Sequence, residues 1–275
     1  MADQGDPLAR IADALDRIAP PPPALVAWSS HPAYVWDGRH ARAIDAIVAP
    51  SLALLRGIDA QKALVTENVA RLAAGHAAHD MLLWGARGMG KSALLRASVA
   101  ETQREDSAAL ALVQVAQDAL AGVVPLFSAL AEVDRCFLVF IDDLGFEEED
   151  GTGPRLLRSW LEGGVEARPG NVRLAVTSNR RAIVPRHARE QDDPLNPRDA
   201  VDDRLALADR FGLSIGFHNA SQDDYLAIVA GYAGELALEW GESDALEWSR
   251  RRGGRSGRVA WQYVTELAGR VGRAI

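Results

Sequence analysis

The segment from Gly85 to Ser92, which reads GARGMGKS, is the feature that most constrains the fold of this chain. It has the spacing G-x-x-x-x-G-K-S, and it lies between the short apolar run MLLW and ALLRASVA, whose apolar residues recur at helical spacing. Glycines let the backbone curl so that successive amides point at a phosphate, and the dipole of the following helix attracts the same charge. The segment therefore predicts a phosphate-binding loop between a strand and a helix.

The last two residues of this loop have distinct expected roles. Lys91 is expected to reach the β- and γ-phosphates of a nucleotide as a point charge, and the Ser92 hydroxyl is expected to bind Mg²⁺. The expected nucleotide contacts in the loop and the first turn of the helix are Gly85, Ala86, Arg87, Gly88, Met89, Gly90, Lys91, Ser92 and Ala93.

A second cluster of functional residues follows an apolar strand. The segment CFLVFIDDLGFEEED places Asp142 and Asp143 where that strand ends, so that both carboxylates are expected at the carboxyl edge of the sheet, beside the loop. Asp142 fits a residue that organises Mg²⁺ through water, and Asp143 fits the residue that orients or deprotonates the attacking water. The alternative is a solvated acidic turn.

Three further polar residues lie at the ends of predicted elements. Asn179, after the run VRLAVT, is expected to hold the lytic water or touch the γ-phosphate, or else to cap the next turn. Arg210, in DRFGLSIGF, is either a finger supplied to a neighbouring subunit's nucleotide or an ion-pair partner of Asp209 or another acid. Arg258 begins a helix and is expected to lean over the γ-phosphate. The other arginines of residues 250–255 fit a solvated face, a nucleic-acid contact or an intersubunit contact.

The apolar runs predict an α/β fold. Continuous apolar runs between helical segments are typical of strands buried on both faces of a parallel sheet. The expected domains are an N-terminal amphipathic helix with a proline-rich tether (residues 1–50), a P-loop core (51–219) and a small C-terminal helical lid (220–275). The five expected strands contain MLLW, LALVQV, CFLVFIDDL, VRLAVT and LSIGF.

Composition limits the cellular compartment and the kinds of binding partner that we expect. The formal net charge of −8 argues against a surface dominated by nucleic-acid binding, although a local basic patch remains compatible with it. A single cysteine, Cys136, forms no intrachain disulfide, which favours the cytoplasm. The sequence has no apolar run long enough for a membrane helix, so we expect no membrane contact.

Five motifs in order, GARGMGKS, FIDD, TSN, DRF and SGR, resemble those of AAA+ ATPases. More narrowly, GIDAQK, LLWGARGMGKSALLRA, FIDDLGFEEED, LEGG, NVRLAVTSNRR and DRFGL resemble the bacterial DUF815 family of predicted ATP-binding proteins. The similarity runs from about Leu54 to Val264. It implies a parallel sheet in the order 5-1-4-3-2, a C-terminal helical lid, ATP and Mg²⁺ as cofactors, and assembly into a ring or arc in which Arg210 acts in trans. It also implies that residues 55–59 line an adenine pocket.

One residue departs from the wider superfamily. Many relatives have Asp-Glu after this strand, whereas this chain has Asp142-Asp143, and aspartate is shorter by one methylene. The water is then expected closer to the strand end, or held partly by Glu147 or Glu148. This departure points to slow hydrolysis and to a nucleotide-dependent switch.

The leading functional hypothesis is an ATPase that binds and hydrolyses MgATP to switch or remodel an unknown macromolecular client. One alternative is a P-loop phosphotransferase acting on a small acceptor. Another is a nucleotide-gated nucleic-acid-binding adaptor of the helicase-loader type, against which the acidic charge counts. Four tryptophans fall on apolar faces, which is typical of core residues rather than of base-stacking platforms: Trp84, Trp160, Trp240 and Trp261.

Overall fold

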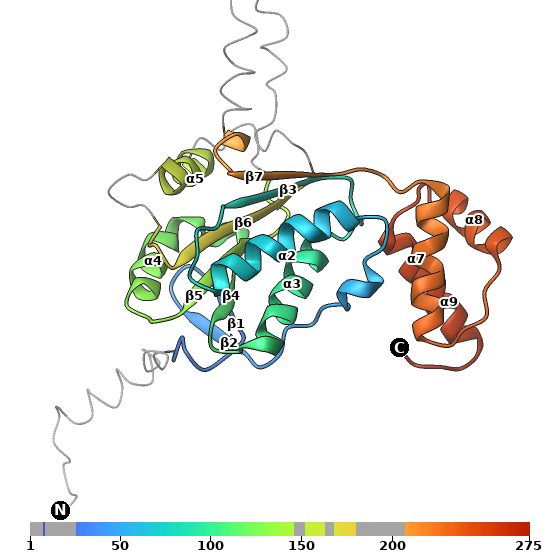
Figure 1. The fold of residues 1–275 in the computed structure, drawn as a ribbon, viewed down its shortest axis with the longest axis horizontal. Helices are drawn as coiled ribbons and strands as arrows, with labels where there is room; N and C mark the ends of the chain where they lie inside the picture. Colours follow the sequence, from blue (N-terminus) through green and yellow to red (C-terminus); the bar gives the residue numbers. More distant parts are fainter. Residues whose placement is uncertain (1–7, 9–25, 146–151, 163–167, 180–206) are drawn as a thin grey trace, which may run out of the picture.

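A computed structural model describes residue 8 and residues 26–145, 152–162, 168–179 and 207–275; the rest is grey in Figure 1. Apart from Leu8, the expected N-terminal helix and its proline tether lie outside the described residues. Glu147 and Glu148, the alternative holders of the water, lie outside them too.

The described residues form one sheet with helices on both of its faces and a separate group of helices at one end (Figure 1). The sheet order is β2-β1-β4-β5-β6-β3-β7, and every strand pair is parallel except β1 with β2. The strands are β1 (Ala33–Trp36), β2 (Ala41–Ile44), β3 (Met81–Gly85), β4 (Leu110–Val115), β5 (Cys136–Ile141), β6 (Val172–Ser178) and β7 (Leu213–Phe217).

The five strands expected from the sequence are β3 to β7, and numbered along the chain they lie in the expected order 5-1-4-3-2. The expectation of five strands was nevertheless too low, because β1 and β2 extend the sheet beyond β4. Both are four residues long and lack a long apolar run. The turn between them contains Asp37-Gly38, a known hairpin signal, with the Asp37 carboxylate accepting from two backbone amides. Residues 33–44 therefore belong to the sheet and not to an extension outside it.

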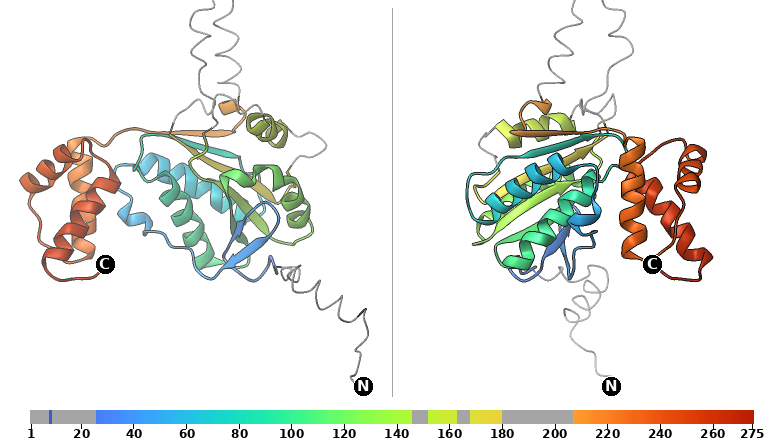
Figure 2. Two further views of the ribbon diagram at one scale, coloured as in Figure 1. Left: turned by 180° about the vertical axis from the view of Figure 1, so that it is seen from behind. Right: turned by 45° about the vertical axis from the view of Figure 1, so that its right-hand side comes forward.

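The core consists of two apolar layers, one on each face of the sheet. Successive side chains of a strand point to opposite faces, so Leu82 of β3 lies in one layer and Met81 and Leu83 lie in the other. Figure 2 shows the helices of the two faces. Helices α2 (Asp59–Ala73) and α3 (Lys91–Glu105) cover the second layer, and α4 (Val123–Ala131) and α5 (Thr152–Glu162) cover the first.

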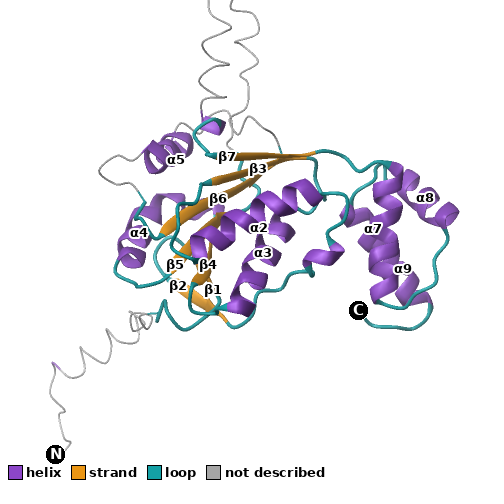
Figure 3. Cartoon of the chain, viewed as in Figure 1, coloured by secondary structure: helices purple, strands orange, loops and turns teal. Residues whose placement is uncertain are grey.

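Three helices form the C-terminal unit that the sequence predicts as a lid, and Figure 3 shows them apart from the sheet. Their buried side chains form a small core of their own. Ser221 and Asp224 form a capping box at the start of the first helix. Among the described residues, no helix has the length and apolar content to cross a membrane. The three helices are α7 (Gln222–Glu235), α8 (Glu242–Arg251) and α9 (Gly257–Arg270).

Candidate nucleotide-binding site

The segment of residues 85–92, which we call the glycine loop, connects β3 to α3 at the carboxyl edge of the sheet. Its three glycines, Gly85, Gly88 and Gly90, all have positive φ angles, of 120°, 76° and 87°. A Cβ on Gly85 would lie 2.1 Å from the carbonyl oxygen of Phe217, so the approach of the loop to β7 requires glycine. The backbone therefore has the curled conformation that the sequence pattern predicts.

Lys91 lies under this loop with 7% of its surface exposed. Its ammonium group donates hydrogen bonds to the carbonyl oxygens of Gly85, at 2.8 Å, and Ala86, at 2.9 Å. The oxygen of the Asn179 amide lies 3.5 Å away on the other side. The lysine is thus held by the loop itself, with its charge at the loop's centre.

The pKa of Lys91 is lowered from its ordinary value, chiefly because burial disfavours the charged form. The carboxylates of Asp143 and Asp142 oppose this shift, and the guanidinium groups of Arg87 and Arg258 add to it. Two acids and three cations therefore share one small region, an arrangement that suits a polyanionic ligand with a bound cation.

Asp142 follows β5, and its Oδ1 atom accepts two hydrogen bonds. One comes from the Ser92 hydroxyl at 2.5 Å, and the other comes from the Thr177 hydroxyl at 2.6 Å. A hydroxyl and a carboxylate this close fit Mg²⁺, which takes oxygen ligands and usually one or two carboxylates together with phosphates and water. Ser92 and Asp142 are the two residues from which the sequence predicts this site.

Asp143 has a left-handed backbone, with φ of 52°, and its partners hold it in place. Its amide donates to the Thr177 hydroxyl at 2.8 Å, so this one hydroxyl connects both aspartates. The Gln117 side-chain amide donates to the carbonyl oxygens of Asp142 and Asp143, at 2.9 and 2.8 Å. The Asn179 amide donates to the Asp143 carboxylate. The sequence patterns did not identify Thr177 or Gln117 as residues of the site.

The C-terminal helices meet the glycine loop directly. The amide of Arg258 donates to the carbonyl oxygen of Gly88 at 3.1 Å, and the Ser256 hydroxyl caps α9 by accepting from Val259. A Cβ on Gly88 would lie 2.9 Å from the Ser256 hydroxyl oxygen, so a side chain here would collide with the start of α9. The contact places Arg258 on the wall of the cavity described next.

A cavity of about 920 Å³ lies between the sheet edge and the C-terminal helices. Of the residues that the sequence predicts as nucleotide contacts, Gly85 and Ala86 do not line it and instead hold Lys91 through their carbonyl oxygens. Three of the five residues expected in an adenine pocket, Leu55, Arg56 and Ile58, line it. The lining also includes Arg87, Gly88, Met89, Gly90, Lys91, Ser92, Ala93, Asp142, Asp143, Asn179, Ile228, Tyr232, Glu235, Trp261 and Arg258.

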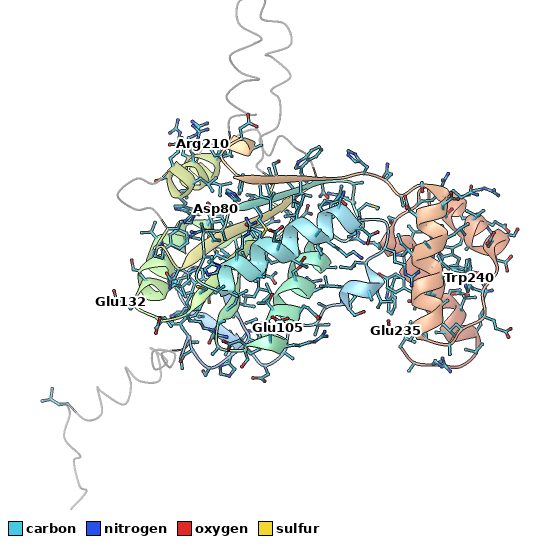
Figure 4. All side chains as sticks on the ribbon, in the orientation of Figure 1. Asp80, Glu105, Glu132, Arg210, Glu235 and Trp240 are labelled. Carbon is cyan, nitrogen blue, oxygen red and sulfur yellow. The ribbon has the colours of Figure 1, made fainter. Side chains whose placement is uncertain are left out.

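Arg210 lies outside this cavity. Figure 4 shows it beside α5, whereas Glu235 lies on the C-terminal helices at the far end of the sheet. Its guanidinium group donates to the carboxylate of Glu162, the last residue of α5. Within one chain, Arg210 therefore forms the ion pair that the sequence analysis gave as the alternative, with Glu162 and not Asp209 as the acid.

The arginines at the end of α8 have contacts of their own. Arg251 pairs with Glu247, and the guanidinium of Arg252 lies 4.7 Å from the centre of the Trp248 ring.

The sheet order, the glycine loop after β3 and the helical C-terminal unit define an AAA+-type P-loop fold. Thermotoga maritima RuvB, a Holliday junction branch migration motor, is similar with a TM-score of 0.52 and 18% identity over 81% of this chain and 66% of that chain. The Aeropyrum pernix ORC1 protein in complex with DNA gives a TM-score of 0.53 and 16% identity, over 82% and 66%. This chain thus spans slightly under two thirds of either structure.

Residues 29–271 match the family described as "Protein of unknown function (DUF815)", and the chain belongs to this family. The match begins about 25 residues before the similarity recognised from the motifs, so it includes β1 and β2. No curated protein matches the sequence.

Proposed function

We propose that this protein binds MgATP in the cavity between the sheet and its C-terminal lid, and that it hydrolyses the nucleotide. The observation that carries the proposal is the glycine loop, which has three positive-φ glycines and a buried lysine, and whose residues 87–92 line one cavity together with Asp142 and Asp143. Loop amides and Lys91 bind the phosphates in this arrangement, and the start of α3 adds its dipole. Bound Mg²⁺ neutralises phosphate charge, and Ser92 and Asp142 are the residues that hold it.

The remaining chemistry is the activation of water. Asp143 is the proposed base, since Asp142 already accepts two hydroxyl hydrogen bonds on one oxygen. Asn179 lies between Lys91 and Asp143 and has an amide that orients a water without adding charge. Arg258 reaches the phosphates from the lid, so that turnover alters the contact between lid and loop.

Arg210 does not line its own chain's cavity and lies beside α5, which is compatible with an oligomer, a ring or arc, in which it reaches a neighbour's site. Movement of the lid against the core then switches or remodels a macromolecular client.

The central test measures binding of MgATP by calorimetry. Lys91→Ala is expected to abolish measurable binding, because it removes the charge under the loop. Arg71→Ala serves as the control, since it removes a cation from the surface of α2, where Arg71 pairs with Glu67. Equal affinity in the Lys91 variant and the wild type would refute the proposal.

A second test addresses the oligomer. Arg210→Ala and Lys91→Ala are each expected to lose ATP turnover. Mixing them is expected to restore part of it, because an intact Arg210 from the Lys91 variant then faces an intact glycine loop. Turnover that remains absent at every mixing ratio would contradict action in trans.

A nucleic-acid-binding adaptor is the second candidate, favoured by the exposed arginines at the end of α8 and in the loop that follows. The two solved neighbours, a Holliday junction motor and a DNA complex, are consistent with it only at the level of the fold. Phosphate contacts release counterions, so the affinity for DNA must fall as salt rises. DNA binding that is absent at low salt would exclude this candidate. The exposed arginines are Arg250, Arg251, Arg252 and Arg255.

A further inference from the structure

Trp261 on α9 is a large aromatic side chain that lines the cavity and has 41% of its surface exposed. The sequence pattern predicts that both Trp261 and Trp160 are core residues. Trp160 is one, because only 1% of its surface is exposed, but Trp261 is not. The expectation that Trp261 is a core residue is therefore wrong. Because the indole lies on the wall of the proposed ligand site, we ask whether it contacts the ligand.

The position of Trp261 relative to the glycine loop is fixed by the start of α9. The Arg258 amide bonds to the carbonyl oxygen of Gly88, and Trp261 follows three residues later on the same face of the helix. Three residues of α-helix rise about 4.5 Å. The indole thus lies about one helical turn from the residue that contacts the glycine loop, on the wall of the same cavity.

Tyr232 of α7 supports the indole from the side. The two rings are 5.1 Å apart between centroids and meet at 72°, which is an edge-to-face arrangement. Burial and the nearby Glu235 carboxylate raise the pKa of the Tyr232 hydroxyl, so this ring is neutral at ordinary pH. Both rings line the same cavity as the glycine loop.

Most of the other side chains that line the cavity beside the two rings are apolar, with Arg56 and Glu235 as charged exceptions, and they come from two segments of the chain. These segments are the one that precedes α2, and α7 with the residue that follows it. A flat apolar ligand group that is covalently attached to phosphates fits between them. The residues are Val48, Ala49, Pro50, Leu54, Leu55, Ile58, Ile228 and Leu236.

We propose that Trp261 is the surface on which the nucleobase stacks, and that Tyr232 holds the indole in the orientation for stacking. The inference rests on the proposed nucleotide function and specifies the part of the ligand that the lid recognises. Stacking depends on the π-face that every base has, so Trp261 contributes to the affinity for a nucleotide over a bare polyphosphate. The base also couples the lid to the core, because it contacts α9 while its phosphates contact the loop.

The experiment measures the affinities of MgATP and of magnesium tripolyphosphate for each protein by calorimetry. Trp261→Ala is expected to weaken MgATP binding on the order of 5- to 150-fold and to leave tripolyphosphate binding unchanged. Trp261→Phe is expected to keep most of the ATP affinity, because phenylalanine retains an aromatic face. Gln262→Ala, the exposed neighbour on α9, is the matched control and is expected to bind both ligands as the wild type does.

The outcomes separate the inference from the proposed function. If the wild type binds tripolyphosphate and ATP with equal affinity, or if Trp261→Ala weakens both ligands alike or neither, the stacking role is refuted while phosphate binding stands. If the wild type binds neither ligand, the proposed function fails, and the inference fails with it. Thermal unfolding of Trp261→Ala near that of Gln262→Ala supports a binding role over a core role.

Discussion

Replacing Thr177 by valine tests how the two aspartates of the site are held. Valine has nearly the same shape but no hydroxyl, and position 177 is 1% exposed, so no water easily takes the hydroxyl's place. The substitution removes the bond to the Asp142 carboxylate, and a bond to a charged group contributes about 1.5–3 kcal/mol. It also leaves the amide of Asp143 without its acceptor, at a cost of about 1–3 kcal/mol.

These two losses together predict a destabilisation of about 2–4 kcal/mol, because valine recovers part of the loss through apolar packing. For a chain of this size, the midpoint of thermal unfolding is expected to fall by roughly 4–16 °C. The left-handed backbone of Asp143 loses one of its restraints, so ATP turnover is expected to fall roughly 10- to 100-fold through misplacement of the proposed base.

The assay compares thermal unfolding and ATP turnover for Thr177→Val, Thr177→Ser and the wild type. Serine keeps the hydroxyl and loses one methyl group, so it is expected to retain turnover while losing some stability to the small void it leaves. A Thr177→Val protein that unfolds within 1 °C of the wild type and turns over ATP at the same rate would refute the bridging role of this hydroxyl.

Two further predictions concern the loop and the lid. Gly85→Ala is expected to destabilise the chain by at least about 2 kcal/mol, because its Cβ would lie 2.1 Å from the Phe217 carbonyl oxygen. Gly254→Ala is the control. A Cβ there would have no atom within 4 Å, so this variant is expected to unfold at the wild-type temperature in the same thermal assay. Burial raises the pKa of Tyr225 to about 12, above its ordinary value of 10. The neutral hydroxyl, which donates to the Ala245 carbonyl, is thus favoured in the folded lid, so stability is intact below pH 10 and is lost as pH rises from 10 to 12. Near-ultraviolet circular dichroism follows this loss, and an alkaline midpoint unchanged in Tyr225→Phe would contradict the assignment.

The sequence predicted the central strands because each is a continuous apolar run. The segment CFLVFI of β5 becomes a strand whose side chains are buried on both faces, and its short length and its valine, isoleucine and two phenylalanines favour a strand over a buried helix. β2 gave no such signal, because its four residues ARAI are only partly buried at the edge of the sheet. Its pairing with β1 depends on the Asp37-Gly38 turn, a local signal that the apolar pattern does not contain.

The same contrast applies to the site. The glycine loop and Asp142 were predictable because their roles follow from spacing along the chain. Thr177 and Gln117 were not, because they act only where β4, β5 and β6 end side by side, and that proximity is a property of the sheet. Trp261 was assigned to a core because an apolar residue at helical spacing has the same pattern whether its helix face meets another helix or a cavity.

The ion pair between Arg210 and Glu162 does not by itself oppose the proposed action of Arg210 in trans. Both side chains are partly exposed, at 30% and 45%, and pairs of this kind contribute about 0–1 kcal/mol after solvent screening. An arginine finger accelerates phosphoryl transfer by about 10³- to 10⁵-fold, which corresponds to about 4–7 kcal/mol of transition-state stabilisation. The gain from engaging a neighbour's nucleotide therefore exceeds the cost of leaving Glu162 several-fold. Under the proposed action in trans, Glu162 would therefore be a resting partner for the guanidinium, which exchanges it for the neighbour's nucleotide.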